Sequence, residues 1–183
     1  MSKSEDSKNV VLMTSGSIAA FKSASLASLT VKKGWEIQCL SSKGGRHFLG
    51  DTTLEGITGK PVLTDMFEPG NALDHIELAD WADLMILYPA SANRITRLRA
   101  GLSDDLIGAL FLANNFRKPW WIAPAMNSNM FEHPAVTDAL EVLESWGCRI
   151  LPTGKSRLAC GTVGYGRLLE PEDAFIMMES ELG

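Results

Sequence analysis

Short runs of apolar residues recur along the chain, and longer segments with helical periodicity separate them. The runs predict five strands, over residues 9–14, 35–42, 83–91, 119–125 and 148–153. After the first run, a helix is predicted from Ser17 to Gly34, where the glycine ends it. Because the runs are apolar throughout instead of alternating with polar residues, both faces of the resulting sheet must be covered.

This order of elements predicts a single α/β domain. Strands that alternate with helices are typical of a doubly wound (Rossmann-like, flavodoxin-like) parallel sheet with helices on both faces. Residues 1–8 are polar and are expected to form a disordered tail, and residues 9–183 to form the domain. A chain of 183 residues is long enough to bury one hydrophobic core.

The composition excludes several classes of partner. Hydrophobic residues make up 45% of the chain, charged residues 21%, and the formal net charge is −5. Nucleic acids and anionic membranes need a basic face, so neither is expected as a partner. No apolar signal segment or membrane span is evident, and a cytoplasmic location is expected. The three cysteines have no metal-binding spacing, so no metal site is expected either.

The candidate ligand-binding residues are those that directly follow the predicted strands, because a parallel sheet binds its ligands at the carboxyl ends of its strands. The segments there are "TSGSIA", "SSKGG", "PASANR", "PAMNSN" and "PTGKSRLACGTVGYGR". Their small, hydroxyl and amide residues let backbone N–H groups approach an anion closely. A ligand that carries phosphate is therefore predicted.

The first of these segments narrows the choice of ligand. Gly16 stands alone there, without the three glycines of a dinucleotide fingerprint, so a pyrophosphate-bound NAD or FAD is disfavoured. Ser17, at the start of the predicted helix, either caps that helix only or also contacts a single terminal phosphate. "PTGKS" lacks the first glycine of a phosphate-binding loop, since Arg149 stands in its place.

Five motifs carry a resemblance to a known family. "SGSIAAFK", "HIELADWADLMILYPASAN", "AGLSDDL", "APAMNSNMFEHP" and "LACGTVGYGR" occur in this order between about residues 9 and 173. Together they resemble the flavin-containing cysteine decarboxylases, and most of all the members that act in coenzyme A biosynthesis. The resemblance implies FMN as cofactor and a homo-oligomer, a trimer or a dodecamer of trimers, with its sites where subunits meet.

The resemblance also implies a reaction. Members of the family oxidise a cysteine-derived substrate at its thiol, after which the carboxylate leaves as CO2. Members in the coenzyme A branch act on 4′-phosphopantothenoylcysteine and reduce the enethiol again to 4′-phosphopantetheine, with hydride from the flavin and a proton from an acid.

Residue roles follow from matching motif positions. His75 and Asn127 match the active-site histidine and the asparagine that holds the substrate carboxylate, and Cys160 matches a proton donor in a flap with glycine hinges at 161, 164 and 166. Arg157 and Arg167 match substrate contacts. The positions that match FMN contacts are Gly16, Ser17, Ile18, Ser41, Lys43, Ser91, Ala92, Asn93, Arg94 and Ala125. "SDDL" is expected to cap a helix and support the flavin pocket.

Without the resemblance, each of these positions has a simpler explanation. His75 would be a surface histidine, Cys160 a structural thiol, and the two arginines solvated loop residues. Cys39 and Cys148, within apolar runs, are expected to be core thiols.

Two departures from the family pattern leave the substrate open. Coenzyme A relatives usually have an aspartate after "ACG", where this chain has Thr162, and "SSKGGRHF" differs from their second loop. The alternatives are an oxidative decarboxylase of peptides with a C-terminal cysteine, and a regulatory flavoprotein without turnover.

Overall fold

A computed structural model describes residues 7–67, 73–157 and 163–183 of the chain. Its core is a five-stranded parallel sheet in the order β2-β1-β3-β4-β5. The strands are β1 (Asn9–Thr14), β2 (Glu36–Ser41), β3 (Leu84–Ala90), β4 (Trp120–Pro124) and β5 (Arg149–Ile150). The predicted doubly wound α/β class is confirmed. All five strands lie within the predicted runs, although β5 is much shorter than the run that contains it.

Helices connect the strands and cover the sheet. The α-helices are α1 (Lys22–Lys32), α2 (Asp51–Thr58), α3 (Asp74–Trp81), α4 (Ala92–Arg99), α5 (Leu106–Asn114), α6 (Ser128–Phe131), α7 (Pro134–Ser145) and α8 (Pro171–Leu182), and the 3₁₀ helices are η1 (Ile18–Phe21) and η2 (Gly45–His47). The helix predicted to begin at Ser17 therefore starts as a 3₁₀ turn and continues as α1.

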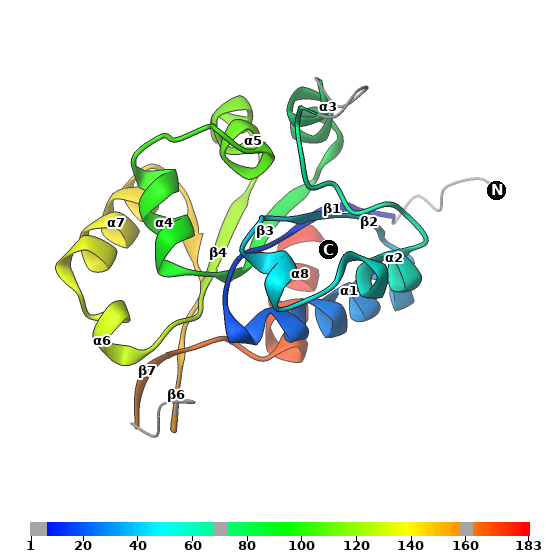
Figure 1. The fold of residues 1–183 in the computed structure, drawn as a ribbon. Coiled ribbons are helices and arrows are strands. Elements are labelled where there is room, and N and C mark those ends of the chain that lie inside the picture. Colours follow the sequence, from blue (N-terminus) through cyan, green and yellow to red (C-terminus); the bar gives the residue numbers. More distant parts are fainter. Residues whose placement is uncertain (1–6, 68–72, 158–162) are drawn as a thin grey trace.

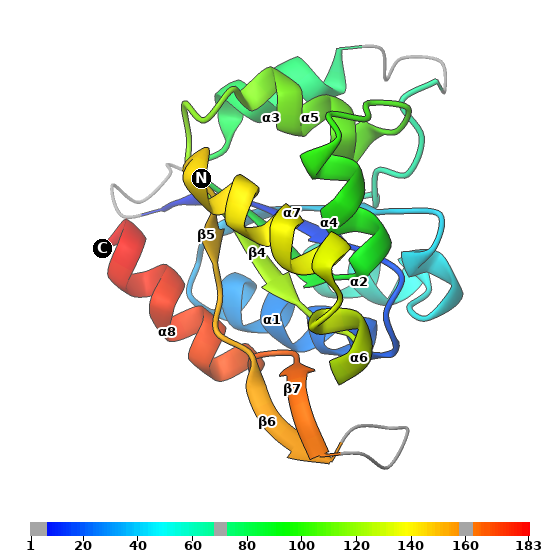
Figure 2. The ribbon, with the colours of Figure 1, turned by 90° about the vertical axis from the view of Figure 1, so that its left-hand side faces the viewer.

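The two faces of the sheet carry separate cores. Alternate strand residues point to opposite sides, so Val10 and Leu12 of β1 join one core while Val11 and Met13 join the other. The first core packs against α1, α2 and α8, and the second against α3, α4, α5 and α7. Figures 1 and 2 show these helices as two layers with the sheet between them. This double cover explains the continuous apolar strands.

A second, two-stranded sheet was not predicted. The antiparallel strands β6 (Gly154–Arg157) and β7 (Val163–Arg167) form a hairpin that projects from the layered body below β4 and β5 (Figures 1 and 2). The glycine-rich segment therefore has two ordered arms. Its tip, residues 158–162, lies outside the described residues.

Two further expectations concern the ends and surface of the chain. Of the expected tail, residues 1–6 lie outside the described ranges, while the Ser7 hydroxyl donates to the Gly34 carbonyl and the Lys8 carbonyl accepts from Glu36 N–H. Within the described ranges, no helix is both long and apolar enough to cross a membrane.

Candidate active site

Hydrogen bonds join the loops that follow the first four strands of the sheet. Ser42 N–H donates to the carbonyl oxygen of Thr14 at 2.9 Å, which ties the β2 loop to β1. The Ser15 hydroxyl donates to the Pro89 carbonyl at 2.8 Å, which ties the β1 loop to β3. The Ser17 hydroxyl donates to the Ala125 carbonyl at 3.1 Å and so reaches the β4 loop. The segments that were predicted to bind a ligand therefore meet at one edge of the sheet.

Glycines allow the first two loops to come this close. A Cβ atom on Gly45 would lie 2.6 Å from the Thr14 carbonyl oxygen, and one on Gly16 would lie 3.3 Å from the backbone of Gly44. A side chain at Gly45 would force the two backbones apart, and one at Gly16 would require a smaller shift of the Gly44 backbone. The glycines of "SSKGG" therefore let two loops of the protein lie close together, whereas their close approach to an anion stays a prediction.

Ser17 caps η1 as well as contacting the β4 loop. Its hydroxyl oxygen accepts from Ala19 N–H at 3.4 Å, and the residue is 9% exposed. The adjoining apolar side chains point to solvent, since Ile18 is 67% exposed and Phe21 59% exposed. Ile18 and Phe21 stand three residues apart in η1, so they form a small exposed apolar surface beside the buried polar loop.

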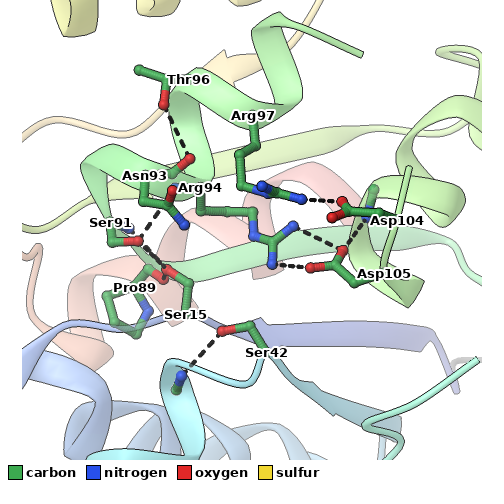
Figure 3. Close-up of polar contacts among 12 residues, drawn as sticks. Ser15, Ser42, Pro89, Ser91, Asn93, Arg94, Thr96, Arg97, Asp104 and Asp105 are labelled. Carbon is green, nitrogen blue, oxygen red and sulfur yellow. Dashed lines mark hydrogen bonds and ion pairs between the residues drawn. The ribbon is translucent and has the colours of Figure 1, made fainter. Parts of the chain in front are cut away.

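The start of α4 forms the next wall of the site (Figure 3). Ser91 caps this helix by accepting from Arg94 N–H at 3.4 Å, and Ser91 N–H itself donates to the Ser15 hydroxyl at 2.8 Å. Ala92 is buried and Asn93 is exposed. The first amides of a helix have no partner within it and favour an anion, so this end of α4 suits a phosphate group.

Arg94 is buried, and its guanidinium group is already engaged. Its two terminal nitrogens donate to both carboxylate oxygens of Asp105, Nη1 to Oδ1 at 2.9 Å and Nη2 to Oδ2 at a very short distance (Figure 3). Asp105 also caps α5 by accepting from Gly108 N–H at 2.9 Å. The cap expected in "SDDL" is confirmed, whereas the ion pair was not foreseen.

The electrostatics of Asp105 follow from these contacts. Burial would raise the pKa of its carboxyl group, but the hydrogen bonds from Arg94 and Gly108 N–H and the charges of Arg94 and Arg97 outweigh burial. The pKa of Asp105 is therefore lowered from its ordinary value of 3.8. At neutral pH the pair consists of a full cation and a full anion.

Several buried polar atoms at this edge have no hydrogen-bond partner in the described part of the chain. They include Thr14 Oγ1, Ser41 Oγ and Arg94 Nε, all on residues that are at most 3% exposed. A buried hydroxyl without a partner is costly, so such atoms often mark a place where a ligand completes the bonding. Hydroxyls, helix amides and close backbones fit a ligand with a phosphate and a polyol chain.

A cavity of about 230 Å³ lies beside this edge. It is bounded by residues 40–43, 63–67 and 104–107, and Ser41, Lys43 and Asp105 are among them. Lys43 is exposed, and no salt bridge to it occurs among the described residues. Its ammonium group is therefore available to an anionic ligand.

Asn127 follows β4 and caps α6. Its side-chain oxygen accepts from Met130 N–H at 2.9 Å, which commits the carbonyl end of the amide to the helix. The side chain is exposed, and its NH2 group makes no hydrogen bond to the described parts of the protein. An amide held in this way presents only its donors, which is the orientation that a carboxylate ligand requires.

Strand β7 lies directly against this loop. Met126 N–H donates to the Gly166 carbonyl at 3.0 Å, and the Ser128 hydroxyl donates to the Tyr165 carbonyl at 3.0 Å. Gly166 has a φ of +105°, and a Cβ atom there would meet the Met126 carbonyl oxygen at 2.5 Å. Only glycine fits at this position, so β7 is anchored beside Asn127.

The structure describes only some of the other candidate residues in and around the β6–β7 hairpin. Cys160 and Gly161 lie outside the described residues, and so does Thr162. Arg157 pairs with Val163 across the hairpin, while its side chain lies outside the description. The Arg167 guanidinium donates to Glu170 at 2.6 Å, a carboxylate that also pairs with Lys22 at 2.8 Å. Arg167 is thus near the site but already has an anionic partner.

His75 lies elsewhere in the protein. It belongs to the first turn of α3, which packs against α5, whereas α6 packs against α7 and β7. Figures 1 and 2 place α3 and α6 well apart. His75 Nδ1 is buried and has no hydrogen-bond partner among the described residues. One copy of the chain therefore does not bring His75 and Asn127 together.

Cys39 and Cys148 belong to the core, as predicted. Both are buried, and burial raises the pKa of each thiol to about 12, with a nearby Lys60 lowering that of Cys39 slightly. The thiolate is the reactive form of cysteine, so neither thiol is suited to chemistry. Among the residues that the structure describes, no three His, Cys, Asp or Glu side chains are grouped to hold a metal ion.

Sequence reasoning missed two serines and one pairing at this site. Ser15 joins two loops through its hydroxyl and Ser42 through its backbone N–H, and both stand in segments that were already singled out for their hydroxyl content. The partner of Arg94, eleven residues further along, had no local signal, because neither helix spacing nor an adjacent charge relates the two residues.

Known proteins match both the sequence and the fold. The family model described as Flavoprotein matches residues 1–180. The Coenzyme A biosynthesis bifunctional protein CoaBC of Bacillus subtilis is 39% identical over 176 residues, which cover 95% of this chain but 43% of that protein. The probable phosphopantothenoylcysteine decarboxylase of Streptococcus mutans is 33% identical over 177 residues, which cover 96% of this chain and 99% of that protein.

Solved structures agree with these matches. A mutant PPC decarboxylase complexed with pantothenoylaminoethenethiol is 30% identical, with a TM-score of 0.84 and coverage of 95% of this chain and 97% of the other. The FMN binding protein AtHal3 is 31% identical, with a TM-score of 0.81 and coverage of 94% and 95%. The chain therefore belongs to the Flavoprotein family of flavin-containing cysteine decarboxylases.

Proposed function

We propose that this protein binds FMN and converts 4′-phosphopantothenoylcysteine to 4′-phosphopantetheine and CO2, a step in coenzyme A biosynthesis. The proposal rests on the orientation of the Asn127 side chain and on the segments that surround it. Its amide donors are exposed beside the hairpin that bears Cys160, and the Ser17–Ala125 hydrogen bond joins its loop to the loops that suit a phosphate-bearing cofactor. The match to the Streptococcus mutans protein over nearly its whole length supports the same substrate.

The residues that would hold FMN are those that line the carboxyl edge of the sheet. When bound, FMN supplies a two-electron acceptor that later returns the electrons as hydride. The amides at the start of α4, with Ser91 and Asn93, would bind its phosphate, and Lys43 would add a positive charge. The buried hydroxyls of Thr14 and Ser41, which have no hydrogen-bond partner in the described part of the chain, would gain one. Gly16, Ser17, Ile18 and Ala125 would contact the rest of the cofactor.

Asn127 would orient the substrate for loss of CO2. Its NH2 group donates to the substrate carboxylate, and the helix cap prevents the amide from turning its oxygen toward that anion. A neutral donor holds the carboxylate without the stabilisation that a cation would give it before its charge is lost. A lysine at this position would bind the substrate more tightly and slow the reaction.

Cys160 would complete the reaction as an acid. After CO2 leaves, one carbon of the enethiol double bond must receive hydride and the other a proton, and a thiol in a closing flap is a suitable proton donor. The anchor between Gly166 and Met126 keeps the base of this flap beside Asn127. Arg157 and Arg167 at the ends of the hairpin strands are the proposed contacts of the substrate, with Arg167 exchanging Glu170 for the substrate phosphate.

We further propose that the working form is a homo-oligomer, a trimer or a dodecamer of trimers. His75 would enter the active site of a second copy, because α3 and α6 of one chain lie far apart. The exposed Ile18 and Phe21 beside the cofactor loops supply apolar surface for that contact. Within the shared site His75 would orient the substrate and assist proton movement.

A second candidate function is oxidative decarboxylation of a peptide that ends in cysteine. The FMN-dependent cysteine decarboxylase SpaF has the same fold, with a TM-score of 0.80 at 25% identity. Thr162 in place of the usual aspartate also leaves this substrate class open. Such an enzyme releases the enethiol without reducing it, so it needs no acid at Cys160. A regulatory flavoprotein would turn over neither substrate.

One substrate assay separates these possibilities. Purified protein should be yellow and should release FMN on denaturation. It should form CO2 and saturated 4′-phosphopantetheine from 4′-phosphopantothenoylcysteine and leave a cysteine-terminated peptide unchanged. Cys160→Ser should still release CO2 but accumulate the enethiol with reduced flavin. A colourless protein that FMN cannot reconstitute would rule out the proposed cofactor, and saturated product from Cys160→Ser would remove Cys160 from the mechanism.

A further inference from the structure

Arg94 stands at the predicted phosphate-binding end of α4, yet its charge is directed to another residue. Both terminal nitrogens of its guanidinium donate to the two carboxylate oxygens of Asp105. The side chain of Arg94 is 4% exposed. A bidentate pair of this kind neutralises the charge of the guanidinium, and Nε is its one nitrogen without a partner among the described residues.

Asp105 holds two helices at once. Its Oδ1 accepts from Arg94 on α4 and from Gly108 N–H in the first turn of α5. The first turn of α5 has little freedom to move, since a Cβ atom on Gly108 would lie 2.1 Å from the Leu102 carbonyl oxygen. The first turn of α5 therefore holds the Asp105 carboxylate in place, and the carboxylate fixes the position of the Arg94 guanidinium relative to α5.

The backbone of Arg94 belongs to the surface that would receive a phosphate. Its N–H donates to the Ser91 hydroxyl, and Ser91 N–H in turn donates to the Ser15 hydroxyl at the end of β1. The first turn of α4 is thus held from two sides, by Ser15 through its backbone and by Asp105 through the Arg94 side chain (Figure 3). The direction in which its free amides point depends on both contacts.

We propose that Arg94 and Asp105 act together as positioning residues for the phosphate of the cofactor, and that Arg94 is not itself a ligand of that phosphate. This inference rests on the proposed binding of FMN. The two side chains together carry no net charge. The phosphate is therefore bound by backbone amides and hydroxyls at the start of α4. Removing Asp105 leaves Arg94 as an unpaired charge in a buried place, and removing Arg94 leaves the partly exposed Asp105 without its cation. Either change lets the first turn of α4 move.

The same two helices supply a matched control. Arg97, one turn further along α4, pairs with Asp104, the residue before Asp105. The side chain of Asp104 is 69% exposed, so this pair is solvated and contributes little. Arg97→Gln removes the same charge from the same helix but keeps the hydrogen bonds between Arg94 and Asp105.

The experiment compares FMN with riboflavin, which lacks the phosphate. Apparent Kd values of both are measured for the wild type, Arg94→Gln, Asp105→Asn, the double variant and Arg97→Gln. Each single variant at the pair should lose about tenfold of the preference for FMN over riboflavin, equivalent to about 1.4 kcal/mol. The double variant should be no worse than the weaker single variant, because the two residues act as one unit. Arg97→Gln should stay within about twofold of the wild type.

Each alternative gives a different pattern. If Arg94 binds the phosphate directly, Arg94→Gln loses the preference while Asp105→Asn keeps or strengthens it, and the proposal is overturned. Equal losses for FMN and riboflavin would reveal a general loss of structure and would also overturn it. If Arg94→Gln does not fold, Arg94→Lys replaces it, and an unchanged FMN preference in that variant contradicts the proposal. A wild type that binds neither flavin refutes the proposed function itself.

Discussion

The hydroxyl group of Ser17 donates to the carbonyl oxygen of Ala125 at 3.1 Å, across 108 positions of sequence. This single bond joins the loop after β1 to the loop after β4, and so the predicted cofactor site to the predicted substrate site. The same oxygen accepts from Ala19 N–H and caps η1. Ser17 therefore couples the two halves of the active edge.

Ser17→Ala should weaken both functions of this hydroxyl. Loss of the cap and of the buried hydrogen bond should lower the free energy of unfolding by about 1–2 kcal/mol, because the Ala125 carbonyl keeps no partner there. FMN affinity should also fall. Urea unfolding and flavin titration check this, with Ser25→Ala on the exposed face of α1 as control. Wild-type values for Ser17→Ala would contradict the coupling.

Gly45→Ala should disturb the β2 loop. The added Cβ atom would lie 2.6 Å from the Thr14 carbonyl oxygen, so the two loops must separate, at a cost of about 1–3 kcal/mol in stability. FMN affinity should fall with it. Gly56→Ala in α2 is the control, since a Cβ atom there meets nothing within 4 Å and should leave stability equal or slightly higher. If Gly45→Ala and Gly56→Ala had the same stability and FMN affinity, the close contact between Gly45 and Thr14 would not be what requires glycine there.

The variant Asn127→Asp tests the proposal that the neutral amide of Asn127 binds the substrate carboxylate. An aspartate oxygen can still accept from Met130 N–H, so α6 and the fold should be preserved. The new charge repels the substrate carboxylate and removes the NH2 donors, so substrate binding should fall at least about 100-fold while FMN stays bound. Steady-state kinetics and flavin absorbance measure this. The control Asn129→Asp adds the same charge two residues away. If substrate binding fell by a similar factor in that variant, the added negative charge alone would explain the result, without a contact between Asn127 and the carboxylate.

Thiol labelling tests the assignment of the cysteines. Cys39 and Cys148 have a pKa of about 12 because they are buried, so neither supplies thiolate near pH 8. The native protein should therefore react rapidly with one equivalent of a disulfide reagent, at Cys160, and the denatured protein with three, the number of cysteines in the chain. Cys160→Ser should show almost no rapid labelling when native. Fast reaction in that variant would contradict the burial of the other two thiols.

The Arg94–Asp105 pair should make stability depend on pH. The pKa of Asp105 is lowered in the folded protein from its ordinary 3.8, so the folded state favours the ionised carboxyl. Its contribution is present in full above pH 3.8 and is lost as the pH falls through the lower, folded value. At pH 7, Asp105→Asn should cost about 1.5–3 kcal/mol, and this difference should shrink below about pH 4.

Urea unfolding at pH 7 and at a series of acid pH values measures that difference. Asp104→Asn is the control, because its side chain is largely exposed and its pair with Arg97 should contribute little at any pH. A constant difference between wild type and Asp105→Asn down to pH 3 would show that the charge of Asp105 is not what stabilises the fold.

Much of the site could be predicted without a structure, although not its geometry. "SGSIA", "SSKGG" and "PASANR" were singled out by composition, and the fold brings them to one edge because the carboxyl ends of parallel strands always meet there. The hairpin β6–β7 was missed because its arms, GKSR and VGYGR, are short and contain no run of apolar residues. Its stability comes from contacts with the Met126 loop instead of from local propensity.

The sequence by itself determined the fold class, since uniformly apolar strands separated by helices can be buried only in a sheet covered on both sides. It also singled out the loops that the fold brings together at one edge of the sheet. Only the tertiary structure decided that Arg94 faces Asp105, that Ser17 reaches Ala125, and that His75 and Asn127 of one chain lie apart. Such relationships depend on strand order and helix packing across many residues, which no local pattern of side chains encodes.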